Sequence, residues 1–511
     1  MVSEPLEAGG QTNRGGPFGR GDAGTPGPPE MPRRVGRRVP NPDAAHWFLG
    51  PPDVPRVPHY TGGNRAEVLI DGAAYMRDLA RHLRGLSRGD EVHLAGWRTS
   101  PSHHLRPDEP GTPTLARSLG ELSAQGVQVR ALLWDLPVPL AGATLTQTRD
   151  NAAFARAVRA CGGEAVLDGR LPWPLLGSHH QKAVVLRSES GVRAYVGGID
   201  LCRGRWDTPR HAGRPARLGR TFAAWHDVQC AVSGEAAAQV WDNFTERWND
   251  RTPPRLFDRA PRPIGTFRPP EVVRGRHFVQ VLRTLAPGVY PFARQGEQSV
   301  ALAYERAVER ARHYIYIEDQ FLWPSRLTRR LRDAAARGVQ VILVTSRTYQ
   351  VPVLGPYHNA LQHDTLQRVR SGAPGRVHVF HLRQAGGRAP IHVHAKVMIV
   401  DDAYAVIGSA NLNRRSHTTD SELALAVVDG DLVPGQVDGR PVEVPRFARD
   451  LRLALWGEHL GLDPATLADP IQALAAWPSP ERPAQVHHAV LHRAALLRLR
   501  VPRLVPALMN P

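Results

Sequence analysis

The segment His392–Asp401, HVHAKVMIVD, decides the fold, because a second segment of the chain matches it closely. That segment is Ser178–Arg187, SHHQKAVVLR. In each one a histidine and a lysine stand two residues apart, and an apolar run follows them. An apolar run of this length with branched side chains is typical of a buried strand. Each run leads to a glycine turn, Gly197-Gly198 or Gly408-Ser409, and the pattern predicts one site built from two similar halves.

The similarity extends upstream of the two histidines. Gly126 and Gly338 each follow a helical pattern and precede a strand-like run, residues 127–134 or 339–344, as expected of a glycine that ends a helix. The glycine and the histidine are 54 residues apart in the first half (180 − 126) and 56 in the second (394 − 338). A repeated order of elements at matching spacing indicates an internal duplication.

Alternating strand and helix patterns predict an α/β protein. We expect two pseudo-symmetric lobes, each a mostly parallel sheet flanked by helices, with the active site at their interface. Periodicity predicts a strand at 91–96, a helix ending near 125, a helix over 299–312, a strand over 314–317 and a helix over 325–337 capped by Ser325. The expected parts are a disordered tail (1–46), a first lobe (47–251), a proline-rich linker (252–270), a second lobe (271–443) and a helical extension (444–511).

Composition limits the class of partner. The chain has 511 residues, 42% of them hydrophobic, with a formal charge of +17 and a pI near 10.7. This charge favours an anionic partner, either nucleic acid or the phosphate face of a membrane, although part of the excess reflects an arginine-rich composition. The three cysteines are Cys161, Cys202 and Cys230, an odd number without zinc spacing that favours a reducing compartment over a disulfide framework.

The sequence contains no apolar run near the roughly 18 residues needed to cross a bilayer, and its first forty residues lack the apolar core of a secretory signal. We therefore expect a cytoplasmic protein that is peripheral at a membrane. Residues 489–508 mix leucine and valine with arginine. This segment is either a membrane contact or a terminal segment docked on its own domain.

The quoted motifs resemble those of the phospholipase D superfamily, whose signature is His-x-Lys-x4-Asp in duplicate. The second copy is complete, with His394, Lys396 and Asp401, whereas the first has Arg187 in place of the aspartate. Residues 225–227 (WHD) and 315–320 (IYIEDQ) resemble segments of the phospholipid-cleaving members of plant and animal type. The resemblance covers about residues 55 to 460.

The resemblance implies two-step chemistry at phosphorus. Lys182 and Lys396 would surround the phosphoryl oxygens with positive charge. His180 would be the nucleophile that forms a phosphohistidine, and His394 would protonate the leaving alcohol and later deprotonate water. The two imidazoles must then begin in opposite protonation states, and the reaction needs no metal or cofactor.

A carboxylate would hold the far nitrogen of each imidazole, as in a catalytic triad. Our candidates are Asp207 for His180 and Glu422 for His394, with Asp420 as a substitute. The competing interpretation of these carboxylates is a loop residue in a surface ion pair.

Further candidates would line the substrate site. Asn411 and Asp200 would bind phosphoryl oxygen or fix the turn, and Gly198 and Ser409 stand where a larger side chain would crowd the phosphate. Glu318 and Gln320, at the end of an apolar strand, would line the pocket or form the polar end of a buried strand. These residues are Asn411, Asp200, Gly198, Ser409, Glu318 and Gln320.

Arg187 is the main departure from the family pattern. We expect the missing aspartate to be structural, with Asp168 or Glu189 compensating for it. The alternative is a noncatalytic relative that binds phospholipid without cleaving it.

The expected function is hydrolysis of a glycerophospholipid, such as phosphatidylcholine, to phosphatidic acid and a free head group, with head-group exchange when an alcohol replaces water. The alternatives are a cardiolipin synthase-type phosphatidyltransferase and a nuclease. We expect a phospholipid substrate at a membrane surface, no stable nucleic-acid partner, no transmembrane segment and a monomeric chain.

Overall fold

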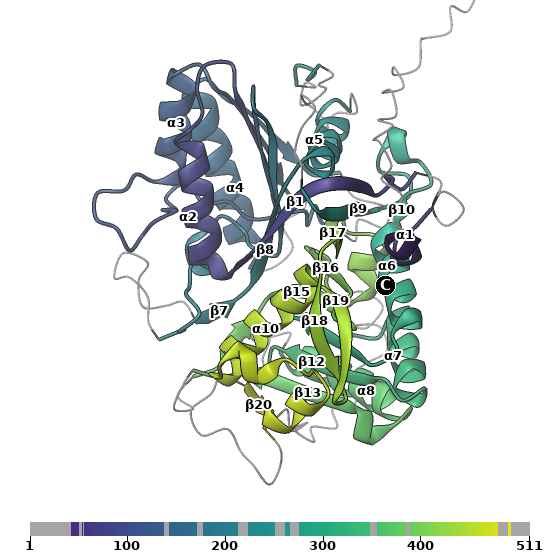
Figure 1. Cartoon of the computed structure of the whole chain (residues 1–511). Coiled ribbons are helices and arrows are strands. Elements are labelled where there is room, and N and C mark those ends of the chain that lie inside the picture. Colours follow the sequence, from purple (N-terminus) through teal and green to yellow (C-terminus); the bar gives the residue numbers. More distant parts are fainter. Residues whose placement is uncertain are drawn as a thin grey trace, which may run out of the picture. The chain divides into compact units, whose positions relative to one another are not determined.

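The computed structural model describes residues 42–50, 54, 56–136, 143–170, 177–212, 223–250, 261–265, 275–347, 355–384, 389–478 and 489–491. All of them belong to one compact unit, whose helices and strands are drawn in Figure 1. The disordered tail expected over 1–46 lies outside the described residues except at its end, where a short helix, α1 (Pro42–Trp47), occurs. Most of the linker expected over 252–270 also lies outside them.

The first half of the chain supplies a sheet and the helices around it. Its elements are β1 (Thr61–Ile70), α2 (Asp71–Leu83), β2 (Glu91–Gly96), α3 (Leu115–Ala124), β3 (Gln128–Trp134), α4 (Ala143–Ala160), β4 (Glu164–Asp168), β5 (Ala183–Ser188), β6 (Gly191–Gly197), η1 (Arg203–Arg205), β7 (Ala224–His226), β8 (Val228–Ser233) and α5 (Glu235–Trp248).

The second half repeats this order. Its elements are β9 (His277–Leu285), β10 (Glu297–Gln298), α6 (Ser299–Arg310), β11 (Tyr314–Asp319), α7 (Arg326–Ala336), β12 (Gln340–Thr345), α8 (Gly355–Arg370), β13 (Val377–Leu382), β14 (Ile391–Val393), β15 (Lys396–Val400), β16 (Tyr404–Gly408), α9 (Arg414–Thr418) and β17 (Glu422–Asp429). The helix expected over 325–337 is confirmed as α7, including the reciprocal capping bonds of Ser325 and Thr328.

The α/β class is confirmed, but the expectation of two mostly parallel sheets needs correction. Most of the strands form one continuous sheet, in which β1 pairs with β8 on one side and with β9 on the other. The pairs β7-β14 and β18-β19 lie outside it. Parallel pairing within this sheet is confined to β2-β3-β4 and β11-β12-β13. Two residues separate β5 from β6 and three separate β15 from β16. Connections this short form antiparallel hairpins, because a parallel crossover needs a dozen residues or more.

The helix-end glycines that revealed the duplication adopt the same turn. Gly126 has φ 93° and Gly338 has φ 98°, a left-handed conformation that favours glycine. In both turns the next residue donates its N–H to a carbonyl five residues back, at 3.1 Å. Each turn therefore directs the chain from a helix into a parallel strand, β3 or β12.

Three large apolar clusters stabilise the fold. One lies under α2, α3 and α4, and a second under α6 and α7. The third contains residues from strands of both halves together with Trp241 of α5 and Trp456 of α10 (Arg446–Leu460). Because β6 and β8 contact β16 and β17, this shared core fixes the histidine-bearing hairpins of the two halves against each other. Truncating one of its large side chains to alanine should cost about 2–5 kcal/mol.

The extension expected to be helical over 444–511 is mixed. A strand pair, β18 (Leu432–Val437) and β19 (Arg440–Pro445), leads into the extension. Its described residues form α10, two short 3-10 helices, η6 (Pro464–Leu467) and η7 (Gln472–Ala476), and β20 (Ala489–Leu491), an edge strand beside β13. The rest of the segment considered as a membrane contact lies outside the described residues. Within the described part of the chain, no helix combines the length and apolarity that crossing a membrane requires.

Arg187 and Asp401 occupy equivalent positions. Arg187 lies opposite Glu91 at the start of β2, and Asp401 accepts hydrogen bonds from three backbone N–H groups before and at the start of β11, at 2.7, 2.9 and 2.8 Å. Arg187 makes the corresponding link through an ion pair with Glu91. Glu91 therefore provides the link that the missing aspartate would make, and compensation by Glu189 stays a prediction. Asp168 instead binds Arg170 and His179.

We predict that Glu91→Gln lowers the free energy of unfolding by about 1–3 kcal/mol near pH 7, as expected when a buried charged partner is removed. Burial opposes ionisation of Glu91, but His93 and Arg187 outweigh it and lower the pKa to about 2. A lowered carboxylate pKa stabilises the fold above the unfolded-state value of 4.5, and this contribution is lost as the pH falls toward about 2. The difference between wild type and variant should therefore shrink below about pH 4.5 in urea denaturation.

The matched control is Glu67→Gln, which removes a more exposed carboxylate that pairs with Arg193 at 3.1 Å. It should change stability by no more than about 1 kcal/mol. Equal losses in the two variants would contradict the structural role of Glu91.

Candidate active site

His180 is held by a carboxylate of the second half of the chain. Its Nδ1 lies 3.0 and 3.1 Å from the two carboxylate oxygens of Glu422. The His180 backbone N–H donates to the Ser421 carbonyl at 2.9 Å, which aligns the histidine with the start of β17. The hydroxyl of Ser409 donates to Glu422 at 2.5 Å. The imidazole is therefore fixed from the opposite lobe.

His394 is held in the same way by the first half. Its Nδ1 lies 2.7 Å from Oδ2 of Asp227, and its backbone N–H donates to the His226 carbonyl at 2.8 Å. Two short parallel strands, β14 and β7, bring these segments together. The Trp225 indole N–H donates to the same Asp227 oxygen at 3.3 Å. Each half thus supplies a histidine to the site and a carboxylate to the histidine of the other half.

This crossed arrangement corrects the pairing expected from the sequence. Glu422 binds His180, not His394. Asp207 accepts a hydrogen bond from the Trp225 backbone N–H at 2.8 Å and lies 3.1 Å from Nδ1 of His211, so it is not the partner of His180. Asp420, the expected substitute, pairs with Arg415 at 2.8 Å.

The glycine turns complete the two-fold pattern. The N–H of Gly198 donates to the Val228 carbonyl, and the N–H of Ser409 donates to the Leu423 carbonyl; Val228 and Leu423 directly follow Asp227 and Glu422. A Cβ at Gly198 would lie 2.1 Å from Oδ1 of Asp227. These two positions therefore lie against the supporting carboxylates, and their contact with substrate stays a prediction.

The two lysines lie beside the histidines. Lys182 donates to the His180 carbonyl at 2.9 Å, and Lys396 donates to the His394 carbonyl. Both side chains are buried, and Nζ of Lys182 lies 3.8 Å from Oδ2 of Asp200. Since Lys182 lowers the pKa of His394 and Lys396 lowers that of His180, the four side chains interact electrostatically across the two halves.

Burial dominates the ionisation of the site. Burial and the nearest lysine lower the pKa of both His180 and His394 well below the ordinary value of 6.5. Burial also raises the pKa of Glu422 to about 7 and that of Asp227 to about 6, against the opposing charge of the lysines. Without a bound anion both imidazoles are therefore neutral, each donating Nδ1–H to its carboxylate. Within the described part of the chain, no hydrogen bond occupies Nε2 of either ring.

The other predicted site residues differ in burial and in their contacts. Asn411 is buried, and its side-chain oxygen has no hydrogen-bond partner among the described residues. Asp200 accepts the Arg98 N–H at 3.0 Å, which fixes the loop after β2. Gln320 is half-buried. Asp401 lies at the far end of β15 from Lys396 and supports the fold as described above.

Glu318 does not line a pocket. It is fully buried, and its two oxygens face His226 at 2.9 Å and His459 at 2.8 Å. The alternative reading, a polar end of a buried strand, fits this placement. His226 also belongs to a second group of histidines and carboxylates, separate from His180 and His394, whose side chains could hold a metal ion.

Sequence reasoning missed three residues near the histidines. Asp227 stands in the WHD segment quoted above, but we assigned it no role in the site. The Trp97 ring lies edge-on to His180 with its centroid 5.6 Å away, and Nζ of Lys182 lies 5.5 Å from the same ring. The Arg205 guanidinium stacks 3.7 Å from the Trp225 ring and lowers the pKa of His394. Only contacts between distant segments reveal these roles.

We predict that ¹⁵N NMR of histidine-labelled protein will show both His180 and His394 as neutral rings protonated at Nδ1 near pH 7. Because their pKa values are lowered well below 6.5, neither ring should titrate between about pH 7 and 6. Single variants assign the two signals. A ring that gains a proton near its ordinary pKa, or that carries its proton on Nε2, would contradict the geometry.

Two family models match parts of the chain. A family model described as "Phospholipase D" matches residues 89–260, and one described as "Cardiolipin synthase, PLD-like domain" matches residues 304–434. Among solved structures, phosphatidylserine synthase of Haemophilus influenzae Rd KW20 is 14% identical and has a TM-score of 0.48, with 72% of this chain and 82% of that chain covered.

Two curated relatives match most of the chain. Phospholipase D A of Dictyostelium discoideum is 27% identical over 492 residues, which cover 81% of this chain and 37% of that protein. Phospholipase D beta 1 of Arabidopsis thaliana is 26% identical over 538 residues, which cover 77% of this chain and 48% of that protein. The chain thus spans between a third and a half of the length of these relatives. With one family model over each half and both histidine motifs in place, the chain belongs to the phospholipase D superfamily.

Proposed function

We propose that the chain is a phospholipase D-type phosphodiesterase that hydrolyses glycerophospholipids such as phosphatidylcholine to phosphatidic acid and a free head group. The observation that carries the proposal is the pair of crossed contacts, His180 with Glu422 and His394 with Asp227. Each contact fixes a ring through Nδ1 and leaves Nε2 for chemistry. Two such rings beside two buried lysines fit a reaction that needs a nucleophile, an acid and bound positive charge.

In the first step, Nε2 of neutral His180 attacks phosphorus, and the bond from phosphorus to the head-group oxygen breaks. The leaving oxygen takes a proton from Nε2 of His394, which must carry that proton when the step begins. The negative charge of a bound phosphodiester favours a protonated ring and offsets part of the effect of the lysines. The products of this step are a phosphatidyl-histidine and the head-group alcohol.

In the second step, His394 accepts a proton from water as the water oxygen attacks phosphorus. The bond between phosphorus and His180 breaks, phosphatidic acid leaves, and both rings return to their starting states. Lys182 and Lys396 contribute positive charge beside the phosphoryl oxygens throughout. Glu422 and Asp227 act as positioning residues that hold the Nδ1–H tautomers and stabilise imidazolium when it forms.

A phosphatidyltransferase is the second candidate function. The match of the second half to a cardiolipin synthase domain favours it. In the second step an alcohol would replace water, and the same two histidines would serve. The balance between hydrolysis and transfer then depends on which acceptor reaches the intermediate.

The cellular setting is part of the same proposal. A phospholipid substrate places the chain at a membrane surface, and its net positive charge would favour an anionic one. The three cysteines are free, which fits the cytoplasm. One chain contains both histidines and both carboxylates, so we propose a monomer as the working unit.

We predict that the protein, incubated with phosphatidylcholine or phosphatidylglycerol and ethanol, will form phosphatidic acid and phosphatidylethanol. His180→Ala and His394→Ala should each lose at least about 10³-fold of this activity, because neither step proceeds without both rings. His313→Ala, which removes an exposed histidine, should retain full activity. Mass spectrometry of quenched reactions should find the phosphatidyl adduct on the peptide that contains His180.

Single-stranded DNA serves as the alternative substrate in the same assay. Histidine-dependent cutting of DNA without lipid products would replace the proposal with a nuclease. Lipid binding without cleavage by the wild type would favour the noncatalytic relative, and an adduct on His394 would reverse the roles of the two histidines.

We predict a bell-shaped pH profile of kcat/KM with its maximum between about pH 7 and 8. Below about pH 7, Glu422 takes up a proton and no longer supports His180. Below about pH 6, Asp227 takes up a proton and no longer supports His394. Above about 8 Lys396, whose pKa is lowered mainly by burial, loses its charge. Each ionisation should change the rate by about tenfold per pH unit.

Glu422→Gln should lower kcat by about 10²–10⁴-fold. It should also move the acid limb of the pH profile from about pH 7 toward pH 6, because the ionisation of Asp227 then sets that limb. Asp420→Asn is the matched control, because Asp420 pairs with Arg415 beside the site, and it should leave the acid limb in place. An unchanged acid limb in Glu422→Gln would refute the assignment.

A further inference from the structure

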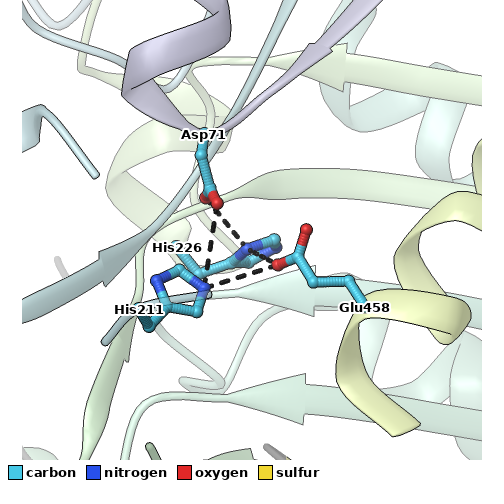
Figure 2. Close-up of side chains that lie close together, drawn as sticks. All are labelled: Asp71, His211, His226 and Glu458. Carbon is cyan, nitrogen blue, oxygen red and sulfur yellow. Dashed lines mark ion pairs between the residues drawn. The ribbon is translucent and has the colours of Figure 1, made fainter. Parts of the chain in front are cut away.

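A second cluster of histidines and carboxylates lies next to Asp227, the carboxylate that holds His394. Its members come from four separate segments: Asp71 begins α2, His226 ends β7, Glu458 lies on α10, and His211 lies in the loop between η1 and β7. Figure 2 shows the four side chains pointing toward one another. One ligand atom from each residue lies within 4.8 Å of all the others.

The spacing of these atoms suits a small cation. Nδ1 of His226 lies 3.0 Å from Glu458 and 3.2 Å from Asp71, and Nε2 of His211 lies 3.4 Å from Glu458 and 3.8 Å from Asp71. Zinc bonds of about 2.0–2.1 Å at tetrahedral angles place ligand atoms about 3.3 Å apart. Three of the four separations lie within 0.3 Å of that value, and the fourth, 3.8 Å, is longer. Asp71 faces His226 through Oδ1 and His211 through Oδ2.

The outer faces of both rings are fixed by other carboxylates. Nδ1 of His211 lies 3.1 Å from Asp207, and Nε2 of His226 lies 2.9 Å from Glu318. An ionised carboxylate only accepts hydrogen bonds, so each ring directs an N–H outward. When the rings are neutral, their inner nitrogens present lone pairs to the same point. Metal-bound histidines characteristically have such carboxylate partners.

Three atoms on Asp71, His226 and Glu458 lack good hydrogen bonds among the described residues. Asp71 and His226 have 0% of their surface exposed. Oδ2 of Asp71, Nδ1 of His226 and Oε1 of Glu458 are buried without a hydrogen bond of acceptable geometry among the described residues. Burying converging polar atoms in this way is costly unless a cation binds them.

We propose that Asp71, His211, His226 and Glu458 form a tetrahedral site for one divalent transition-metal cation, and that zinc is its occupant. Two imidazoles and two carboxylates form a nitrogen and oxygen donor set that zinc accepts in protein sites. All four positions are filled by the protein, which is typical of a structural metal that does not bind substrate.

A pair of protons is the competing occupant. Without a metal, Asp71, Asp207 and Glu458 outweigh burial and raise the pKa of His211 to about 9, and the carboxylates around His226 raise its pKa as well. Two imidazolium ions would then supply the positive charge that one dication supplies. Metal content separates the two states directly.

The cation would hold in place the segment that positions His394 in the active site. The carbonyl of His226 accepts the His394 N–H at 2.8 Å, and the Asp71 N–H donates to the Asp227 carbonyl at 2.8 Å. Through the cation, Glu458 on α10 would be connected to Asp71 at the start of α2. The metal therefore holds β7 and Asp227 in place without contacting the phosphate. This effect on catalysis rests on the proposed function, whereas the binding of metal does not.

The test is elemental analysis of the full chain after dialysis against a small excess of zinc and then against metal-free buffer. We expect about one equivalent of zinc per chain, its removal by a chelator with a drop in melting temperature, and recovery of that temperature on adding zinc. Cobalt(II) in its place should give the absorption spectrum of a tetrahedral site. One equivalent of another divalent metal in place of zinc would uphold the site and overturn the choice of metal.

Two variants locate the metal. Glu458→Gln and His211→Ala should each weaken zinc binding by at least about 10-fold, whereas His417→Gln, which changes a buried histidine elsewhere, should retain the full equivalent. If a variant fails to fold, the cobalt spectrum of the wild type still reports the site. Absence of bound metal, with no effect of zinc or chelator on melting, would assign the cluster to protons and overturn the proposal.

Discussion

The structure depends on an exchange of carboxylates between the two halves of the chain. Glu422 reaches His180 across 242 residues of sequence, and Asp227 reaches His394 across 167. Neither half can form a complete histidine site alone. Breaking either contact would leave a buried carboxylate without a hydrogen-bond donor, which typically costs about 1–3 kcal/mol. The shared apolar core, which contains strands from both halves, supplies the rigidity that such contacts need.

The sequence predicted the features that depend only on neighbouring residues. The cap of α7 by Ser325 and the left-handed turns at Gly126 and Gly338 depend on neighbouring residues, and the sequence predicted all three. The partners of the histidines depend on which strands come together, and that information is not local. Sequence reasoning gave His180 the nearer Asp207, but the backbone places Asp207 against His211 and Trp225. The continuous sheet was missed for the same reason, because the pairing of β1 with β9 joins distant segments.

Arg187 shows how a motif residue can change without changing the site. It occupies the register of Asp401, at the end of its strand farthest from the lysine, and fixes the start of the neighbouring strand through Glu91. In the second half, Asp401 performs that task by accepting backbone N–H groups. An arginine cannot accept them, so the first half uses a side-chain ion pair instead. This departure from the motif is consequently poor support for a noncatalytic relative, since both histidines and both supporting carboxylates are in place.

The two-fold symmetry of the contacts does not extend to the charges around them. Asp420 and Asp200 raise the pKa of His180 against the lysines, whereas the strongest charges acting on His394, those of Lys396, Arg205 and Lys182, all lower its pKa. Because burial lowers the pKa of both rings, the charges of the free chain do not by themselves leave His394 protonated, as an acid must be. A substrate bound with its phosphate closer to Nε2 of His394 would supply the missing negative charge there. Substrate binding, and not the protein alone, would then decide which of two nearly equivalent rings attacks phosphorus.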